Sequence, residues 1–195
     1  MKRIKKVRIV QITLIIGILL VTCAVMLLVS SELIQKKSIR ENKKIVQEMY
    51  SLMPEVTKGY LDDRIDITMP LLEIRGENFA GIIEIPKYNR TLPVHGTWNK
   101  SKTKKFPCVF SGSIYDNSLI IGGSDNTGHF DFMKTISEGD MVFVTDTTGS
   151  RFSYTIDKIE ITKDISRTNL TKGDYNLVLF ARNTRSLDYT IIRLV

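Results

Sequence analysis

The feature that most constrains this chain is an apolar run from Ile9 to Ser30 that contains no charged residue. As an α-helix, a run of this length measures roughly 33 Å, enough to cross a hydrocarbon core about 30 Å thick. A basic tail comes before it, made of Lys2, Arg3, Lys5, Lys6 and Arg8. Basic flanks tend to stay in the cytoplasm. We therefore expect residues 1–8 inside, residues 9–30 as a transmembrane helix and the rest of the chain outside. Basic residues also follow the run, so this orientation depends on the shortness of the first tail.

Two alternatives to a membrane anchor fit the run less well. A cleaved signal peptide has a shorter apolar region that ends in small residues at its cleavage site. A lipoprotein site is conceivable at Cys23, but Thr22 is a poor residue before such a cysteine, and the apolar run continues beyond it. The length of the run favours a single-pass anchor in the cell membrane.

Charge and cysteine content exclude several classes of function. The net charge is +7, but residues 1–8 carry most of it, and the part from Asn78 onward is only weakly basic. That part has no basic stripe interleaved with aromatic residues, so we expect no nucleic-acid partner. Cys23 lies in the apolar run and Cys108 in the outer part, which makes a disulfide between them implausible. No metal-ligand spacing is present either, so we expect no metal and no cofactor.

Residues 31–77 are expected to connect the membrane span to an outer domain. Ser31 to about Met53 is rich in helix formers, and Pro54 is expected to end this juxtamembrane helix. The apolar second half of the helix either packs on the outer domain or extends straight from the membrane. Gly59 to Glu77, with an aspartate cluster and Pro70, is typical of a linker that is disordered or wraps the domain.

From about residue 78 the pattern changes to short β-strands separated by turns. Strands are expected at 81–85, 91–94, 118–123, 141–146, 152–161, 175–181 and 189–195, with one or two helical turns within 130–136. The turn at 147–150 between two alternating runs predicts a β-hairpin. About eight short strands in this length indicate a closed or nearly closed barrel. The predicted fold is therefore mainly β, an eight-stranded barrel over 78–195 with short helices, preceded by the transmembrane and juxtamembrane helices.

Several fragments of the outer part together resemble the sortases, the membrane-anchored cysteine transpeptidases of Gram-positive cell surfaces. Residues 79–86 followed by 92–94 (FAGIIEIP and LPV) are similar to the family's opening strand and its "IP…LPV" stretch. Residues 111–123 resemble the approach to the strand that carries the family's catalytic histidine. Residues 129–140 resemble its "HF…L..L..GD" pattern, and residues 149–156 its "G..F.Y.V" strand. The order and spacing of these fragments carry the resemblance.

The resemblance implies a catalytic histidine, cysteine and arginine, but the matching positions hold other residues. The family's histidine follows an Ala-Gly turn, and here Gly122-Gly123 is followed by Ser124. The cysteine ends a strand that corresponds to residues 177–182, which places Arg182 there, or Phe180 in a shifted register. The arginine begins the last strand, where this chain has Tyr189.

These replacements lack the chemistry that the family uses, in which a thiolate attacks a peptide carbonyl, a histidine transfers protons and an arginine stabilises negative charge. Serine is no base near pH 7, and neither arginine nor phenylalanine is a nucleophile. The resemblance therefore predicts a non-catalytic sortase-like protein that binds or scaffolds cell-surface or pilus proteins through a sorting-type peptide. The residues expected to line its peptide groove are Ser124, His129, Arg182, Arg185 and Tyr189, with Arg193 as a further nearby cation. The simpler interpretation of the three arginines is a solvated face.

The alternative is an active cysteine transpeptidase or peptidase that uses Cys108 with His129 or His95. Cys108 is the only cysteine outside the apolar run. We expect it to be either a packed apolar residue or a lone external thiol. The simpler interpretations of the histidines are a hydrogen-bonded structural role for His129 and a surface position for His95.

Overall fold

The computed structural model describes residues 2–59, 68–184 and 186–195, without the side chains of residues 2–13, 15, 31 and 34. The chain divides into two compact units, residues 1–38 and residues 39–195. The aspartate cluster of the predicted linker and the predicted groove residue Arg185 lie outside the described residues.

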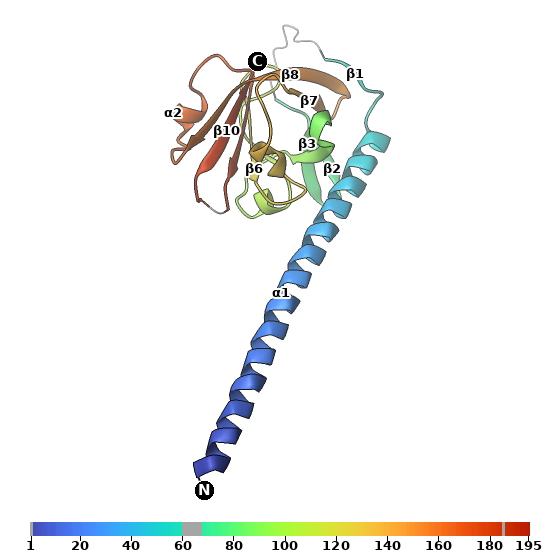
Figure 1. The fold of residues 1–195 in the computed structure, drawn as a ribbon. Helices are drawn as coiled ribbons and strands as arrows, with labels where there is room; N and C mark the ends of the chain where they lie inside the picture. The colour runs from blue at the N-terminus through green and yellow to red at the C-terminus, as the bar shows by residue number, and fades with distance from the viewer. Residues whose placement is uncertain (1, 60–67, 185) are drawn as a thin grey trace. The chain divides into compact units, whose positions relative to one another are not determined.

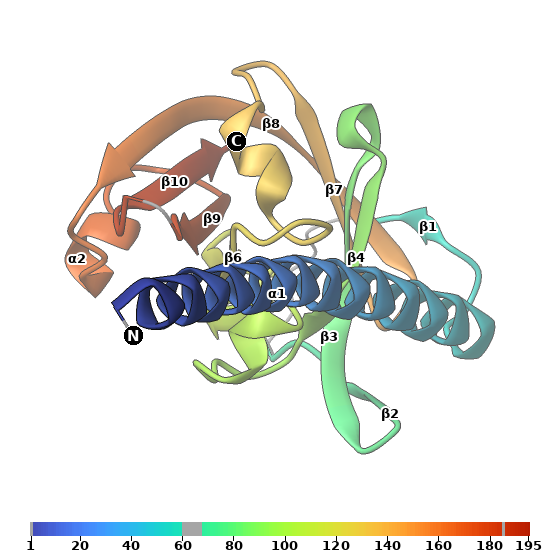
Figure 2. The ribbon, with the colours of Figure 1, turned by 60° about the horizontal axis from the view of Figure 1, so that its bottom comes forward.

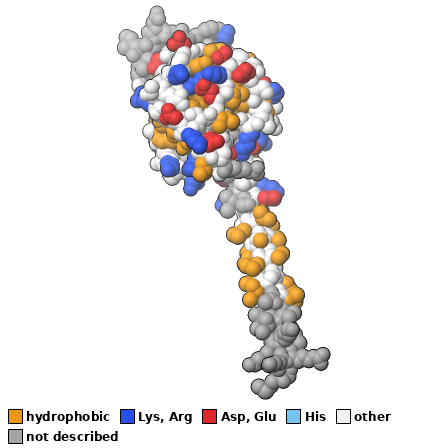
Figure 3. Space-filling model, turned by 60° about the vertical axis from the view of Figure 1, so that its left-hand side comes forward, with side chains coloured by type: hydrophobic (Ala, Val, Ile, Leu, Met, Phe, Trp, Pro, Cys, Tyr) orange, Lys and Arg blue, Asp and Glu red, His pale blue; other side chains and the backbone are white. Residues whose placement is uncertain are grey.

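The first unit belongs to one continuous helix, α1 (Lys2–Leu52), which includes both the predicted transmembrane segment and the predicted juxtamembrane helix. Within it, Ile16–Leu52 is the one described segment that is long and apolar enough to cross a membrane. By length and composition alone, this segment fits a membrane span or a signal sequence. The described apolar side chains in its first half, residues 16–33, are exposed, for example Leu20 and Met26. Figure 3 shows hydrophobic side chains in orange along the helix.

The second unit contains a closed eight-stranded β-barrel, as the strand pattern predicts (Figures 1 and 2). The ring of hydrogen-bonded neighbours runs β8–β10–β9–β6–β5–β4–β3–β7 and returns to β8. The strands are β3 (Glu77–Ile85), β4 (Arg90–His95), β5 (Cys108–Ser111), β6 (Leu119–Ser124), β7 (Met141–Asp146), β8 (Ser150–Thr162), β9 (Leu177–Arg182) and β10 (Tyr189–Leu194). β8 is long and curved, so it pairs with β7 along its first half and with β10 along its second half (Figure 2).

Two pairs within the ring are parallel, and they differ greatly in length. β6 and β9 pair along their full length, whereas β4 and β5 pair only at His95 and Cys108. The barrel interior holds one large apolar cluster built from alternate residues of the strands, such as Ile121, Leu179 and Ile192. Alternate residues of a strand point to opposite faces, so the intervening positions face outward.

Short elements decorate the barrel. β1 (Thr57–Lys58) pairs with the start of β8, and β2 (Leu72–Ile74) forms a hairpin with β3. The hairpin turns through Arg75 and Gly76, which both have positive φ, as a two-residue turn of this kind requires. The remaining helices are short: the 3₁₀ helices η1 (Pro86–Tyr88), η2 (Lys102–Lys104) and η3 (Asp131–Lys134), and the single α-helical turn α2 (Arg167–Leu170).

The C-terminal end of α1 packs on the barrel, which is the first of the two arrangements considered from the sequence. A buried apolar cluster joins the helix to β2, β3 and the segment before β5; its members are Ile45, Val46, Met49, Met53, Ile74, Phe79, Ile82 and Phe106. Asn42 is also buried there and donates a hydrogen bond to the Lys105 carbonyl at 3.1 Å. Pro54 follows the last helical residues, as expected. The end of α1 and β2 therefore share a hydrophobic core with the barrel.

All the strands expected from the sequence are present, and η3 falls within the predicted helical turns. Three short strands, β1, β2 and β5, were not predicted from the sequence, because each is too short to show alternation. Ile161 continues β8 as expected but is 71% exposed. After Ile156, the residues of β8 that face the barrel interior no longer fall on the same alternate positions. This change lies beside the irregular pairing between β8 and the end of β10.

Candidate functional site

Three outward-facing residues meet side by side at the ends of β6, β9 and β10. Ser124 of β6 is the register partner of Arg182 on β9, and Arg182 is the register partner of Tyr189 on β10. Outward positions further along these strands, such as Val178 and Ile191, form an apolar cluster outside the barrel. The strand registers therefore bring together the three positions that the sequence analysis matched to the catalytic residues of the sortases. Phe180, which occupies the shifted register, is on the same face.

These residues line a groove of about 610 Å³. Its walls come from the segment before β5, the ends of β6 and β9, the segment before α2 and the β9–β10 loop. The described lining residues are Trp98, Lys100, Thr103, Lys104, Phe110, Gly123, Ser124, Asn126, Ile165, Phe180, Arg182, Thr184, Leu187 and Tyr189. This volume is within the usual range of ligand pockets.

Three aromatic rings form the floor of the groove. Trp98 lies 5.1 Å from Phe110 and 5.4 Å from Phe180, measured between ring centroids, and Phe110 lies 5.4 Å from Phe180. Gly122 makes this packing possible, because a Cβ atom there would be 2.3 Å from the Trp98 ring and 2.5 Å from the Phe180 ring. Trp98 remains 37% exposed, so the floor offers an apolar surface to a ligand.

The charge of the groove is positive. Lys100, Lys104 and Arg182 line it, and no lining residue in the described part of the chain is acidic. None of these three cations forms an ion pair with a described residue. The groove therefore presents cationic groups around an aromatic floor.

His129 does not line this groove; it lies buried behind Ser124. Its ring is 3% exposed, and its Nδ1 atom is 3.0 Å from the Ser124 carbonyl oxygen. Burial lowers the pKa of His129 to about 4, so the ring is neutral near pH 7. This arrangement agrees with a structural role and differs from the prediction that His129 contacts a peptide.

A buried carboxylate joins two loops beside the groove. Asp125 accepts hydrogen bonds from the Thr184 Oγ1 atom at 2.7 Å and the Thr184 backbone nitrogen at 3.2 Å, and it pairs with Lys134 at 2.9 Å. Burial by itself would raise the pKa of the Asp125 carboxyl group. The hydrogen bonds from Thr184 and the ion pair with Lys134 outweigh burial and lower this pKa below its usual value. The charged Asp125 side chain therefore holds the loop after β6 and the loop after β9 together at the edge of the groove.

Cys108 lies on β5 with its side chain fully buried, so it is a packed residue and no external thiol. Its Sγ atom donates a weak hydrogen bond to the Phe106 carbonyl at 3.5 Å. Burial raises the pKa of the Cys108 thiol to about 11, which keeps it protonated near pH 7.

The expectation of a surface position for His95 is wrong. His95 is 7% exposed and is the register partner of Cys108. Its ring nitrogens contact the Thr97 carbonyl at 2.9 Å and the Glu77 carboxylate at 3.3 Å. Among the described residues, no hydrogen bond joins Cys108 to His95 or His129.

Arg193 belongs to the core of the fold, which corrects its expected place near the groove. It is 2% exposed and pairs with Glu160 at 2.7 Å. It also donates to the carbonyls of Asn169, Leu170 and Lys172. These bonds fasten α2 to β10, so of the predicted arginines only Arg182 is seen in the groove.

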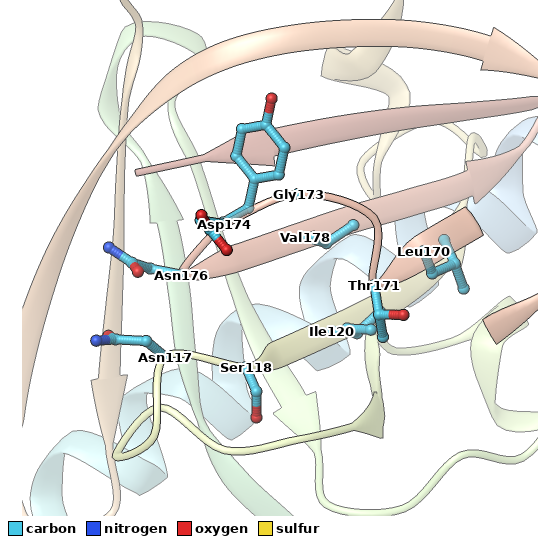
Figure 4. A pocket seen from close by; sticks show the side chains of 10 residues that line it. Asn117, Ser118, Ile120, Leu170, Thr171, Gly173, Asp174, Asn176 and Val178 are labelled. Atoms are coloured by element: carbon cyan, nitrogen blue, oxygen red, sulfur yellow. The ribbon is translucent and has the colours of Figure 1, made fainter. Parts of the chain in front are cut away.

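A smaller pocket of about 300 Å³ lies at the opposite ends of β6 and β9 (Figure 4). Ile120, Leu170 and Val178 form its apolar floor, and Asn117 and Asn176 stand at its edge. Its lining contains no basic side chain among the described residues. Likewise, nowhere in the described part of the chain do three His, Cys, Asp or Glu side chains meet in a way that could hold a metal ion.

The closed barrel with an outer groove at the ends of β6, β9 and β10 has the fold of solved sortases. The pilus-related sortase C of Group B Streptococcus is 20% identical, with 82% of this chain and 89% of that chain covered and a TM-score of 0.52. Sortase A from Corynebacterium diphtheriae is 14% identical, with 82% of each chain covered and a TM-score of 0.54. Sortase C from Clostridium perfringens, solved with the C-terminal cell wall sorting motif, is 15% identical, with 82% and 85% covered and a TM-score of 0.52.

A family model of the sortase domain matches residues 83–186, slightly more than half of the chain. The chain belongs to the sortase family, as the sequence fragments indicate. A comparison with curated proteins gives no match.

Proposed function

We propose that this sortase-family protein is a membrane-anchored, extracytoplasmic binding protein that holds a peptide segment of a cell-surface or pilus protein without cleaving it. The observation that carries the proposal is the arrangement of Ser124, Arg182 and Tyr189, which are register neighbours on one wall of an open groove. These three residues on its wall are not the histidine, cysteine and arginine that the resemblance to sortases implies.

The chemistry of these three residues supports binding over catalysis. The Ser124 hydroxyl makes no hydrogen bond to any described residue, so it has no base to activate it. The Arg182 guanidinium is a cation and not a nucleophile. The Tyr189 hydroxyl offers one hydrogen bond but no positive charge. Each group can contact a bound peptide, and together they lack a nucleophile and a general base.

The surroundings of Cys108 speak against the alternative of an unorthodox cysteine enzyme. A nucleophilic cysteine needs access to its substrate and a lowered pKa. The Cys108 side chain has no exposed surface, and its pKa is raised. A substrate would reach this thiol only if β5 opened.

Family membership supports the proposed ligand class, and the N-terminal sequence supports the proposed anchor. Sortase C from Clostridium perfringens has been solved with a cell wall sorting motif, which supports a peptide of this type as the ligand here. The basic tail and the apolar run support a cytoplasmic N-terminus, a single span at residues 9–30 and an outer domain that meets secreted partners.

Trp98 allows a direct test, because it is the only tryptophan of the chain and lies on the groove floor. Full-length protein in detergent micelles is titrated with the cell wall sorting motif peptide used for the Clostridium perfringens structure. We expect a saturable change in Trp98 emission, with all of the peptide recovered intact by chromatography. A Phe180→Ala variant, which removes part of the floor, should bind the peptide at least about tenfold more weakly. Binding with progressive cleavage would contradict the proposal, and so would an unchanged Trp98 signal at millimolar peptide.

A further inference from the structure

We infer that the groove selects an extended peptide in which acidic side chains flank an apolar residue. This inference rests on the proposed function, which requires only that the groove hold a peptide. It adds the chemical class of the segment that is held, and the distribution of charge around the aromatic floor carries it.

The cations reach the groove from two separate walls. The segment before β5 contains four lysines between Lys100 and Lys105. Lys102 pairs with Glu77, whereas Lys100 and Lys104 line the groove. Arg182 lines it from the end of β9. A peptide in the groove is therefore close to cations that come from two different segments of the chain.

Nearby carboxylates do not neutralise these cations. Asp125 is 3% exposed and already pairs with Lys134. Asp164 accepts a hydrogen bond from the Ser166 backbone nitrogen at 2.7 Å, and neither Asp164 nor Asp188 is among the described lining residues. The positive charge of the groove is thus available to a ligand that brings its own carboxylates.

The aromatic floor favours an acidic peptide over an anionic polymer such as a polyphosphate as the ligand. Trp98, Phe110 and Phe180 form an apolar surface, to which Ile165 and Leu187 contribute. A polyphosphate would leave this surface exposed to water. A peptide covers it with an apolar side chain while its acidic side chains reach the rim.

The number of cations favours acidic side chains over a single C-terminal carboxylate. One terminal carboxylate would pair with only one of the two walls. In an extended strand the residues on either side of the apolar residue point away from the floor toward the rim, because successive side chains point to opposite faces. Two or three acidic side chains at such positions therefore lie along the rim, where separate carboxylates can meet separate cations.

The experiment compares three capped nonapeptides by Trp98 fluorescence on the full-length protein in uncharged detergent micelles. The acidic probe is acetyl-Gly-Ser-Glu-Leu-Glu-Val-Glu-Ser-Gly-amide, and in the two others Gln or Lys replaces every Glu. At about 20 mM salt we expect the acidic probe to bind about tenfold more tightly than the Gln probe, and the Lys probe most weakly. The difference should shrink at about 500 mM salt, because ions screen exposed charges.

Charge-reversal variants show which cations cause the preference for the acidic probe. Arg182→Glu and, independently, Lys100→Glu with Lys104→Glu should abolish the preference for the acidic probe. Lys105→Glu, an exposed lysine of the same segment that does not line the groove, should keep most of the preference. Retention of the full preference in both groove variants would overturn the inference.

Other outcomes separate this inference from the proposed function. Equal binding of the acidic and Gln probes by the wild-type protein would overturn the inference and leave the proposed function standing. Failure of all three probes and of the sorting motif peptide would overturn both. Displacement of the acidic probe by polyphosphate at equal charge concentration would reassign the groove to a phosphate polymer. Tighter binding of a Gln probe with a free C-terminus would reassign it to a terminal carboxylate.

Discussion

Asp125 accepts hydrogen bonds from both the backbone nitrogen and the Oγ1 atom of Thr184, which joins the loop after β6 to the loop after β9. These two loops form one rim of the groove. Their geometry therefore depends on a single buried carboxylate and not on the strand registers alone.

Replacement of Asp125 should weaken the fold and loosen this rim. Asp125→Ala removes two hydrogen bonds and an ion pair at a buried site, so we expect a loss of about 2 kcal/mol in the free energy of unfolding. Urea unfolding followed by Trp98 fluorescence measures it. Asp157→Ala, at an exposed position with no described ion pair, is the matched control and should change stability by less than about 0.5 kcal/mol. Equal effects of the two variants would refute a bracing role for Asp125.

The end of α1 should contribute to the stability of the barrel as a core element. Met49 is fully buried against β2 and β3, and Met49→Ala should cost about 2–4 kcal/mol. Leu52→Ala lies less than one turn away at a residue that is 59% exposed and should be almost neutral. A small effect of Met49→Ala in the same urea assay would mean that the helix end is not part of the core.

The same packing sets the boundary of a stable soluble fragment. Residues 39–195 retain the buried helix end, whereas residues 78–195 would expose Phe79, Ile82 and Phe106. We expect cooperative thermal unfolding of the longer fragment and aggregation or molten behaviour of the shorter one. Equal cooperativity of the two fragments, by calorimetry, would contradict this.

Buried His129 should make the protein sensitive to mild acid. Its pKa is lowered to about 4 in the folded protein, while in the unfolded chain it is near 6.5. Between these values the unfolded state binds the extra proton, so stability falls as the pH drops from about 6.5 to about 4, by on the order of 3 kcal/mol. Urea unfolding at a series of pH values tests this. His129→Gln should flatten the curve in this window, and an unchanged curve would place the acid sensitivity elsewhere.

The thiol of Cys108 should be unreactive in the folded protein. In a Cys23→Ser background, Cys108 is the only remaining cysteine. Because it is buried and protonated, we expect an aromatic disulfide reagent at pH 8 to label it at least about 100-fold more slowly than in guanidinium. Fast labelling of the native protein would reopen the possibility of a catalytic role for this residue.

The sequence predicted most of the barrel, because its long strands alternate and are separated by clear turn residues. It could not predict β5, where Cys108 and Val109 follow Pro107 in a run of only four residues. It also left open whether the helix end packs on the barrel. That question depends on Phe79 and Phe106, which come together only in the folded chain.

The candidate site was predictable on one wall only. Ser124, Arg182 and Tyr189 follow from family spacing, and the strand registers explain why they meet. Trp98 and Lys104 lie between β4 and β5, where the sequence has no periodic pattern, so it did not predict that they line the same groove as Arg182. The prediction for Arg193 was wrong because the sequence does not show which way its side chain points. In the structure the guanidinium is buried and donates to backbone carbonyls at α2.

The proposal that this protein binds a peptide without catalysis is tested most directly by intact-protein mass spectrometry during incubation with a sorting motif peptide, with an active sortase as positive control. We predict that the mass of this protein stays unchanged and that the peptide remains uncleaved. We further predict that Ser124→His with Arg182→Cys and Tyr189→Arg introduces a detectable thioacyl adduct. A covalent adduct on Cys108 of the wild-type protein, or release of a cleaved peptide, would contradict the proposal.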